Sequence, residues 1–378
     1  MRSLDIARDT CERHHPGLVK GLADVPLLER EAAGSPVVDI FRTHGGPALL
    51  VPTTYGGLGA DALDAVRVTR AIGAYSPSLG AAATMHNFTA AMLFALAERA
   101  SRPSESQADL LARIAPDGLL LASGWAEGRT QQNILNPAVV ATPVDDGFIL
   151  NGAKKPCSLS RSMDLLTASA TLPSDDGVPS LAILLVPADS DGISIHPFWS
   201  SDILAAAQSD EVRLRDVHVP ARLIIRPTPD DPGRLDDLQT AAFVWFELLI
   251  TSAYVGIAST LTERVLERHR GSVTDRAALG IQMESTVALT EGTARAISDG
   301  VSSDDAVANV LTTRYAVQKA RAAVAELAVE LLGGIAFIES SEVAYLSSAL
   351  HPLGFHPPGR TSTSQGLVDY FAGGPLLI

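Results

Sequence analysis

The segment DDGFILNGAKKPCSLSRSMDLLTASA, Asp145 to Ala170, is the stretch around which the rest of the chain is organised. Phe148 to Leu150 form a short extended run, and the Asn151-Gly152 pair after it predicts a tight turn, because both residues tolerate a positive φ at little cost. A polar loop from Lys154 to Ser158 follows, and then a second apolar run. The pattern predicts a β-hairpin whose loop is fixed by strands, the kind of loop that directs small hydroxyl groups at ligands.

The composition of the 378-residue chain favours packed helices, since hydrophobic residues make up 46% of it and aromatic residues only 5%. A formal net charge of −14 argues against a nucleic-acid partner and against an anionic membrane surface, which both need a basic face. The two cysteines, Cys11 and Cys157, are far apart and lack metal-ligand spacing. This cysteine usage indicates a reducing compartment, the cytoplasm, and predicts no metal site.

Two segments bear on membrane targeting. The amino terminus, MRSLDIARDTCERHH, is charged and has no apolar core of a secretory signal. Ala241 to Leu261 is the most apolar long window, but Glu247 and several hydroxyl residues interrupt it. A buried helix of a bundle explains this window better than a membrane span does.

The pattern of the sequence divides the chain into a helical unit at residues 1–116, a β unit at 117–228 and a second helical unit at 229–378. Asp61 is expected to cap a helix in the first unit. In the middle unit, short β-branched or apolar runs alternate with Gly, Pro, Asp and Ser, which predicts a compact antiparallel β domain. The last unit is predicted to be an antiparallel four-helix bundle, with helices at Asp236–Arg268, Val273–Ser298, Ser303–Leu332 and Glu342–Ala349. The fold class is therefore multidomain α+β.

Four motifs occur in an order that one family shares. They are VPTTYGGLGAD (Val51 to Asp61), the β segment from Phe148 to Ala170, Trp199 with QSDEVRLRDVHVP (Gln208 to Pro220), and ELLGG (Glu330 to Gly334). With these motifs on this background, the sequence resembles the acyl-CoA dehydrogenase superfamily over essentially its whole length. That superfamily includes a branch of flavin monooxygenases, and the resemblance implies the same three-domain fold.

The resemblance also implies a flavin cofactor, either FAD or, as the alternative, reduced FMN or FADH2 supplied by a flavin reductase. A flavin ring needs an apolar slot with hydrogen-bond donors at its edges. Ser158 resembles the residue whose hydroxyl approaches the flavin N5, and Trp125 and Ala126 lie where backbone groups meet the pyrimidine side of the ring. In the simpler interpretation, Ser158 satisfies a turn and Trp125 belongs to the core.

Three further residues are implied to hold the remainder of FAD. Gly333 and Gly334 resemble the glycines that let the adenine dinucleotide of a neighbouring subunit approach the backbone, which implies a homodimer or a homotetramer. Arg268 lies in RHRGS, which replaces the family's own element, and is either a pyrophosphate contact or an exposed arginine at a helix end. The two glycines also suit a simple helix stop.

The sequence departs most from the family at its proton-abstracting end. In the dehydrogenases, a glutamate near the carboxyl terminus removes the α-proton of an acyl thioester. Here that region reads FHPP, Phe355 to Pro358, so that His356 stands about where the base would be, and histidine serves as a general base near neutral pH. Other members carry the base on the first long helix of the bundle, where Glu247 is the nearest acid. It lies one residue past the expected position, which turns its side chain by about 100°.

Three functions therefore stay open. A flavin-dependent dehydrogenase would desaturate an acyl thioester, on CoA or on a carrier protein, with Glu247 or His356 as its base. A flavin monooxygenase would instead need a dry pocket and a hydrogen-bond donor, for which Ser158 is suited. The third function is a non-catalytic partner subunit of a heteromeric dehydrogenase. The sequence favours a flavin-dependent oxidoreductase acting on an acyl thioester or a related specialised metabolite, and it leaves dehydrogenation and hydroxylation unseparated.

Overall fold

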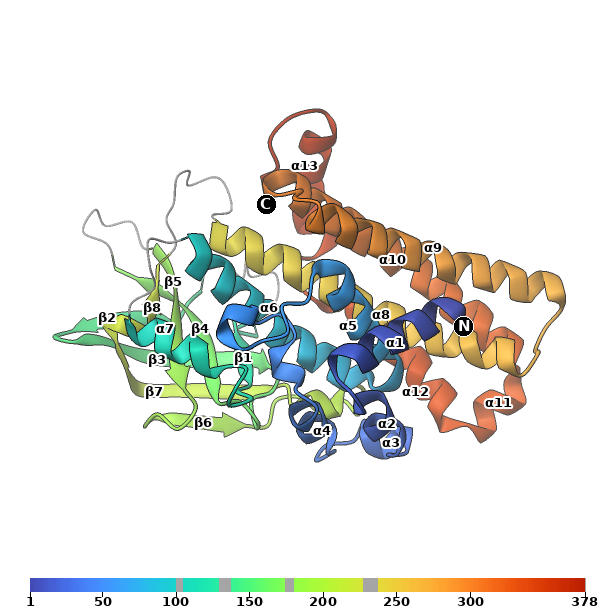
Figure 1. Cartoon of the computed structure of the whole chain (residues 1–378), viewed down its shortest axis with the longest axis horizontal. Coiled ribbons are helices and arrows are strands. Elements are labelled where there is room, and N and C mark those ends of the chain that lie inside the picture. Colours follow the sequence, from blue (N-terminus) through green and yellow to red (C-terminus); the bar gives the residue numbers. More distant parts are fainter. Residues whose placement is uncertain (100–104, 129–136, 174–179, 227–236, 378) are drawn as a thin grey trace.

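The chain begins with helices that pack along one side of a long central helix (Figure 1). The computed structural model describes residues 1–99, 105–128, 137–173, 180–226 and 237–377. The first helices are α1 (Arg2–His14), α2 (Leu18–Ala23), α3 (Leu27–Arg30), α4 (Val37–Thr43), α5 (Ala62–Tyr75), α6 (Pro77–Arg99) and α7 (Glu105–Arg113). Asp61 caps α5 as predicted, because its carboxylate accepts the backbone N–H of Asp64 at 2.8 Å.

The middle of the chain forms one eight-stranded sheet at one end of the molecule (Figure 1). Its strands are β1 (Leu121–Gly124), β2 (Val140–Val144), β3 (Gly147–Cys157), β4 (Leu165–Leu172), β5 (Ser180–Pro187), β6 (Ile193–His196), β7 (Asp210–Pro220) and β8 (Ile224–Ile225). The strand order is β6-β7-β3-β2-β4-β5-β8, with β1 also paired to β4. Most neighbours are antiparallel; β1 pairs with β4 in parallel, as does one residue pair between β2 and β4.

The turn predicted at Asn151-Gly152 is wrong, because β3 runs straight through these two residues. The hairpin turn lies earlier, at residues 145–146, between β2 and β3. Asn151 instead exchanges two hydrogen bonds with Asp216 on β7, and the β3–β7 register shifts between Leu150 and Gly152. The Asn-Gly pair therefore forms a β-bulge within β3 instead of a turn. As a result, Lys154 lies in the strand and the loop begins at Ser158.

The long helix α8 (Asp237–Glu267) is the central element of the helical part, beside α9 (Val273–Ser298) and α10 (Ser303–Leu332). It also packs directly against α5, where a Cβ on Gly73 would lie only 2.2 Å from the carbonyl oxygen of Ala253. Its Gln239–Glu267 portion is long and apolar enough to cross a membrane, yet 83% of its most apolar window is buried inside the fold. As the sequence indicated, this burial is that of a core helix of a bundle.

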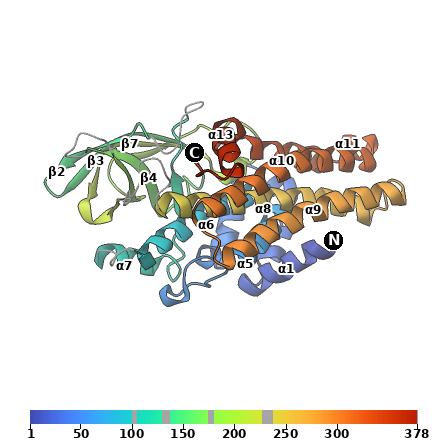
Figure 2. The ribbon, with the colours of Figure 1, turned by 90° about the horizontal axis from the view of Figure 1, so that it is seen from above.

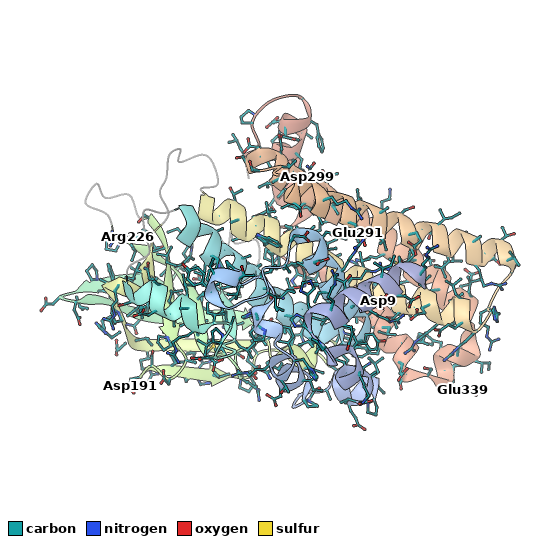
Figure 3. The ribbon with its side chains drawn as sticks, viewed as in Figure 1. Asp9, Asp191, Arg226, Glu291, Asp299 and Glu339 are labelled. Atoms are coloured by element: carbon teal, nitrogen blue, oxygen red, sulfur yellow. The ribbon has the colours of Figure 1, made fainter. Side chains whose placement is uncertain are left out.

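The last part of the chain folds back from the far end of the bundle towards the sheet (Figure 2). It consists of α11 (Gly334–Glu339), α12 (Ser341–Ala349), a 3₁₀ turn (His351–Phe355) and α13 (Arg360–Phe371). Exposed acidic residues are distributed over separate elements, as Asp9, Asp191 and Asp299 show (Figure 3). The predicted fold class is confirmed, while the domain boundaries after residues 116 and 228 stay a prediction.

Candidate functional site

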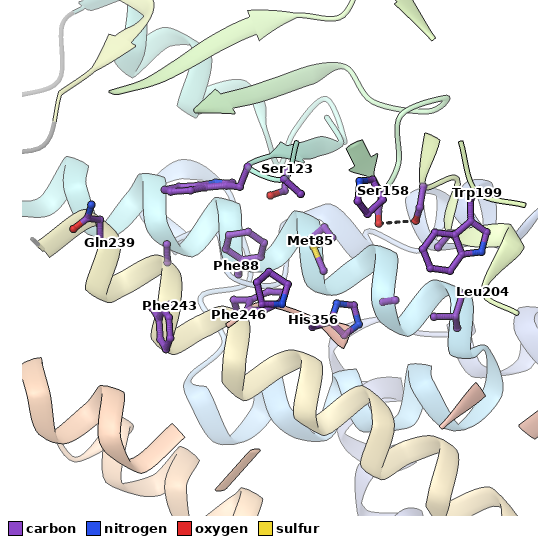
Figure 4. A pocket seen from close by; sticks show the side chains of 18 residues that line it. Met85, Phe88, Ser123, Ser158, Trp199, Leu204, Gln239, Phe243, Phe246 and His356 are labelled. Carbon is purple, nitrogen blue, oxygen red and sulfur yellow. Dashed lines mark hydrogen bonds between the residues drawn. The ribbon is translucent and has the colours of Figure 1, made fainter. Parts of the chain in front are cut away.

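A cavity lies where the sheet meets α6 and the amino-terminal part of α8 (Figure 4). It contains about 970 Å³ of empty space, part of which is open to solvent. Ser123 and Ser158 come from the sheet side, while Met85, Phe88 and Phe246 face them from the helices. Segments that are far apart in the sequence thus build one site.

The sheet-side wall brings together the three residues that the sequence predicted for the flavin ring. Trp125 and Ala126 follow β1, and Ser158 follows β3, and all three line the cavity. The Ser158 hydroxyl lies 2.9 Å from the hydroxyl of Ser209, which precedes β7. The indole Nε1 of Trp125 is buried without a hydrogen-bond partner, so the wall carries a donor that the described part of the chain does not satisfy.

A buried ion pair supports this wall from behind. Lys154 Nζ donates to Glu127 at 2.7 Å and to Ser169 Oγ at 3.1 Å, and Lys154 is fully buried. The Glu127 carboxylate also accepts the backbone N–H groups of Ala138 and Val139. Burial alone would raise the pKa of Glu127, but the hydrogen bonds from Lys154 and from the backbone lower it to about 2. Glu127 is therefore ionised and fixes the segment that follows Trp125 and Ala126.

The helix-side wall is apolar and aromatic. The rings of Phe88 on α6 and Phe246 on α8 pack edge to face with their centroids 5.4 Å apart. Met85 and Ala81 of α6, together with Leu204 before a short 3₁₀ helix at Ala205–Ala207, continue this surface. Such a lining disfavours water along this side of the cavity.

The structure places His356 in this cavity, as the sequence suggested for a catalytic residue. Its Nε2 lies 3.1 Å from the hydroxyl of Tyr254, and its ring packs edge to face on Phe246 with centroids 6.0 Å apart. Burial and the neighbouring Arg314 guanidinium lower the pKa of His356 to about 3. The imidazole is therefore neutral at physiological pH.

Glu247, the other predicted base, does not line the cavity. Its carboxylate is fully buried and accepts two hydrogen bonds from Arg314 Nη1, at 2.6 and 2.8 Å. Burial raises the pKa of Glu247 to about 7, against the opposing effect of Arg314. The one-residue displacement seen in the sequence thus turns this acid away from the site and into an ion pair between α8 and α10.

Arg314 also holds the segment that carries His356. Its guanidinium donates to the carbonyl oxygens of Leu353 at 3.1 Å and Pro357 at 3.3 Å, and to that of His356 itself. Sequence reasoning found neither Arg314 nor Tyr254, because both lie within long apolar helices where only the tertiary contacts reveal their role. The polar residues inside otherwise apolar helical windows were the available signal.

Arg268, Gly333 and Gly334 lie far from this cavity. Arg268 follows α8 and is about 33 Å along the helix axis from Phe246, at 1.5 Å per residue. The loop after it packs on the end of α10, since a Cβ on Gly271 would lie 2.5 Å from Leu331. The three residues therefore cluster at the opposite end of the bundle, where they are not positioned to bind the flavin of the same chain.

The cavity fits the ring of a flavin. It offers aromatic and aliphatic walls, the hydroxyls of Ser158 and Ser209 at one side, and, within one wall, the buried Nε1 of Trp125, which no described group satisfies. These are the features that an isoalloxazine ring requires. In the described parts of the chain, no cluster of His, Cys, Asp and Glu residues suits a metal ion.

Comparison with known proteins shows what this architecture belongs to. Residues 19–103 match the family described as acyl-CoA dehydrogenase, N-terminal domain. The chain is 75% identical over all 378 residues, and over the full length of both proteins, to isobutylamine N-hydroxylase of Streptomyces viridifaciens. It is 27% identical to dibenzothiophene monooxygenase of Rhodococcus qingshengii over 294 residues, which cover 73% of this chain and 67% of that protein.

Among solved structures, KijD3 in complex with FMN and an amino-sugar nucleotide superposes with a TM-score of 0.83 at 18% identity, covering 99% of this chain and 94% of that one. The prediction of a flavin-dependent oxidoreductase is confirmed at the level of the family, and the relatives match its monooxygenase alternative. Flavin-bound neighbours of this fold agree with the predicted FAD or reduced flavin. The chain belongs to the flavin monooxygenases of the acyl-CoA dehydrogenase-like fold, the family of isobutylamine N-hydroxylase.

Proposed function

We propose that this protein uses reduced flavin and dioxygen to hydroxylate the nitrogen of a small primary alkylamine. The observation that carries the proposal is the 75% identity, without truncation of either chain, to an isobutylamine N-hydroxylase. KijD3, solved in complex with FMN and an amino-sugar nucleotide, is a more distant example of an amine bound in this fold.

The helix-side wall suits a short branched alkyl group. Ala81, Met85, Phe88, Leu204 and Phe246 form a compact apolar surface, and each methylene buried there contributes about 0.8 kcal/mol. Among the described residues that line the cavity, none carries a carboxylate that would stabilise an ammonium ion. This lining favours the neutral amine over the ammonium ion. Oxygen transfer requires the lone pair that only the neutral amine has.

The reaction converts amine, dioxygen and reduced flavin into hydroxylamine, water and oxidised flavin. When bound, reduced flavin supplies the two electrons that the reaction requires. One oxygen atom of dioxygen then enters the hydroxylamine and the other enters water. We assign Ser158, Trp125 and Ala126 to the edge of the ring, with Ser158 as a hydrogen-bond donor. The aromatic wall excludes water, and His356 faces the substrate. Glu247 serves as a buried anchor, because an N-hydroxylation needs no base for an α-proton.

The partners follow from the same reading. Arg268, Gly333 and Gly334 would serve the flavin of a second subunit, which makes the protein a homodimer or a homotetramer. Exposed apolar side chains on α9, α11 and α13 support this, namely Val273, Ile281, Ile335, Phe337, Ile338, Val368 and Phe371. A separate flavin reductase would deliver reduced FAD or FMN in the cytoplasm, and the substrate would be free instead of carried on CoA or a carrier protein.

The test uses purified full-length protein with NADH, a flavin reductase, FAD or FMN, and isobutylamine. We expect the N-hydroxylamine by mass spectrometry, and no product when the reductase is omitted. The proposal fails if no primary alkylamine is hydroxylated with either flavin. Anaerobic bleaching of bound flavin by an acyl thioester would instead establish dehydrogenation.

A further inference from the structure

His356 is held on two sides by residues that do not themselves line the cavity. Tyr254 contacts its ring from α8, and Arg314 contacts its backbone carbonyl from α10. Both residues are almost completely buried, Tyr254 with 1% and Arg314 with 1% of its surface exposed. These two contacts hold a histidine that lies on the turn between a 3₁₀ helix and α13.

The contact with Tyr254 determines which ring nitrogen of His356 carries the proton. In the described part of the chain, the only hydrogen-bond partner of the Tyr254 hydroxyl is His356 Nε2. A buried phenol that did not donate would leave an unsatisfied O–H group, which is costly. Burial raises the pKa of Tyr254, so the phenol stays protonated. Its O–H group therefore donates a hydrogen bond to Nε2. A neutral imidazole that accepts at Nε2 carries its hydrogen on Nδ1.

The other nitrogen, Nδ1, is therefore available to donate a hydrogen bond to a molecule in the cavity. Within the described residues it has no hydrogen-bond partner, and it is not among the polar atoms sealed away from open space. The ring itself lines the cavity opposite Ser158 (Figure 4). Nδ1–H is then a neutral donor on a ring that lines the cavity.

We propose that Tyr254 is a positioning residue that fixes His356 in the Nδ1–H tautomer, while Arg314 fixes the backbone on which this donor is mounted. The inference rests on the proposed function and deepens it. A neutral N–H group stabilises charge that develops on an oxygen atom during transfer to the amine, and it leaves the amine lone pair unprotonated. In the opposite tautomer, Nδ1 would carry a lone pair and no hydrogen, and this lone pair would repel such an oxygen atom.

The test reads the tautomer directly. Protein labelled with ¹⁵N-histidine has nine histidine side chains, and long-range ¹H–¹⁵N spectra distinguish the two tautomers of each neutral ring. The His356 signal is assigned by its loss in His356→Gln. We expect Nδ1–H in the wild type and a shift towards the Nε2–H tautomer in Tyr254→Phe. A wild-type ring protonated on Nε2, or an unchanged tautomer in Tyr254→Phe, would overturn the proposal.

Kinetics provide the second readout. Tyr254→Phe should lower kcat for amine hydroxylation at least tenfold and change KM for the amine less than twofold. Tyr315→Phe is the matched control, because its hydroxyl bonds Thr363 at 2.8 Å and the carbonyl oxygen of Pro358 at 3.4 Å, so it perturbs the same segment without touching the His356 ring. Equal losses of kcat in both variants would show general destabilisation and refute the positioning role. The tautomer spectra need no substrate, so they remain decisive even if amine hydroxylation itself is not found.

Discussion

The buried pair of Glu247 and Arg314 gives a prediction that separates stability from positioning. Glu247→Leu leaves the Arg314 guanidinium, 1% exposed, without its counter-ion, because an arginine does not lose its proton. Removing one partner of such a pair costs about 3–5 kcal/mol. We therefore expect Glu247→Leu to lower the free energy of unfolding by about 4 kcal/mol, measured by urea denaturation.

The double variant Glu247→Leu/Arg314→Met removes both charges and replaces them with apolar side chains of similar size. It should be more stable than Glu247→Leu because no charge is left uncompensated, yet less stable than the wild type by about 1–3 kcal/mol, because carbonyl oxygens that Arg314 bonded are left without a donor. Its turnover should not return, because the carbonyl oxygens of Leu353, His356 and Pro357 have lost their common donor.

The surface pair of Lys20 and Asp24 is the control, with side chains 81% and 64% exposed. Asp24→Ala should change the free energy of unfolding by less than about 1 kcal/mol and leave turnover unchanged. Our reasoning would be refuted if Glu247→Leu were as stable as the wild type. Wild-type turnover in the double variant would equally refute it.

Three further predictions concern the site and buried residues around it. Ser158→Ala should weaken flavin binding about 2- to 10-fold in a fluorescence titration, the value of one hydrogen bond, and Ser209→Ala should do so less. Glu127→Gln should cost about 3 kcal/mol or more in urea melts, because the fully buried Lys154 loses its counter-ion. His86 on α6 is fully buried, with Nε2 2.9 Å from the carbonyl oxygen of Pro47 and Nδ1 accepting the backbone N–H of Leu121 at 3.1 Å. Burial lowers the pKa of His86 from 6.5 to about 4, so its contribution to stability is constant above pH 6.5 and lost as the pH falls towards 4. Relative to His86→Gln, the wild type should lose about 3 kcal/mol across that range in pH-dependent melts.

Much of the fold was predictable because local rules decided it. The Asp61 cap, the long apolar window of α8 and the alternation of the middle unit each follow from nearest-neighbour chemistry. The Asn151-Gly152 turn failed for a tertiary reason. Asp216 on β7 offers hydrogen bonds that a bulge satisfies and a turn would not, and no local pattern shows that partner.

The candidate site was predictable on its flavin side and less so on its substrate side. Trp125, Ala126 and Ser158 meet in one cavity because they follow the ends of two strands, β1 and β3, of the same sheet. The role of Glu247 depended on the rotation of one helix and on Arg314, which lies 67 residues away. The roles of Tyr254 and Arg314 follow from their contacts with His356, which form only when α8, α10 and the segment around His356 pack together.

The most direct test of the central claim is the source of the oxygen in the product. We predict that isobutylamine, a flavin reductase, NADH and ¹⁸O₂ yield a hydroxylamine that carries one ¹⁸O atom in the presence of this protein. A hydroxylamine without the label, or hydrogen peroxide as the sole product of oxygen consumption, would contradict the assignment of this cavity to amine N-hydroxylation.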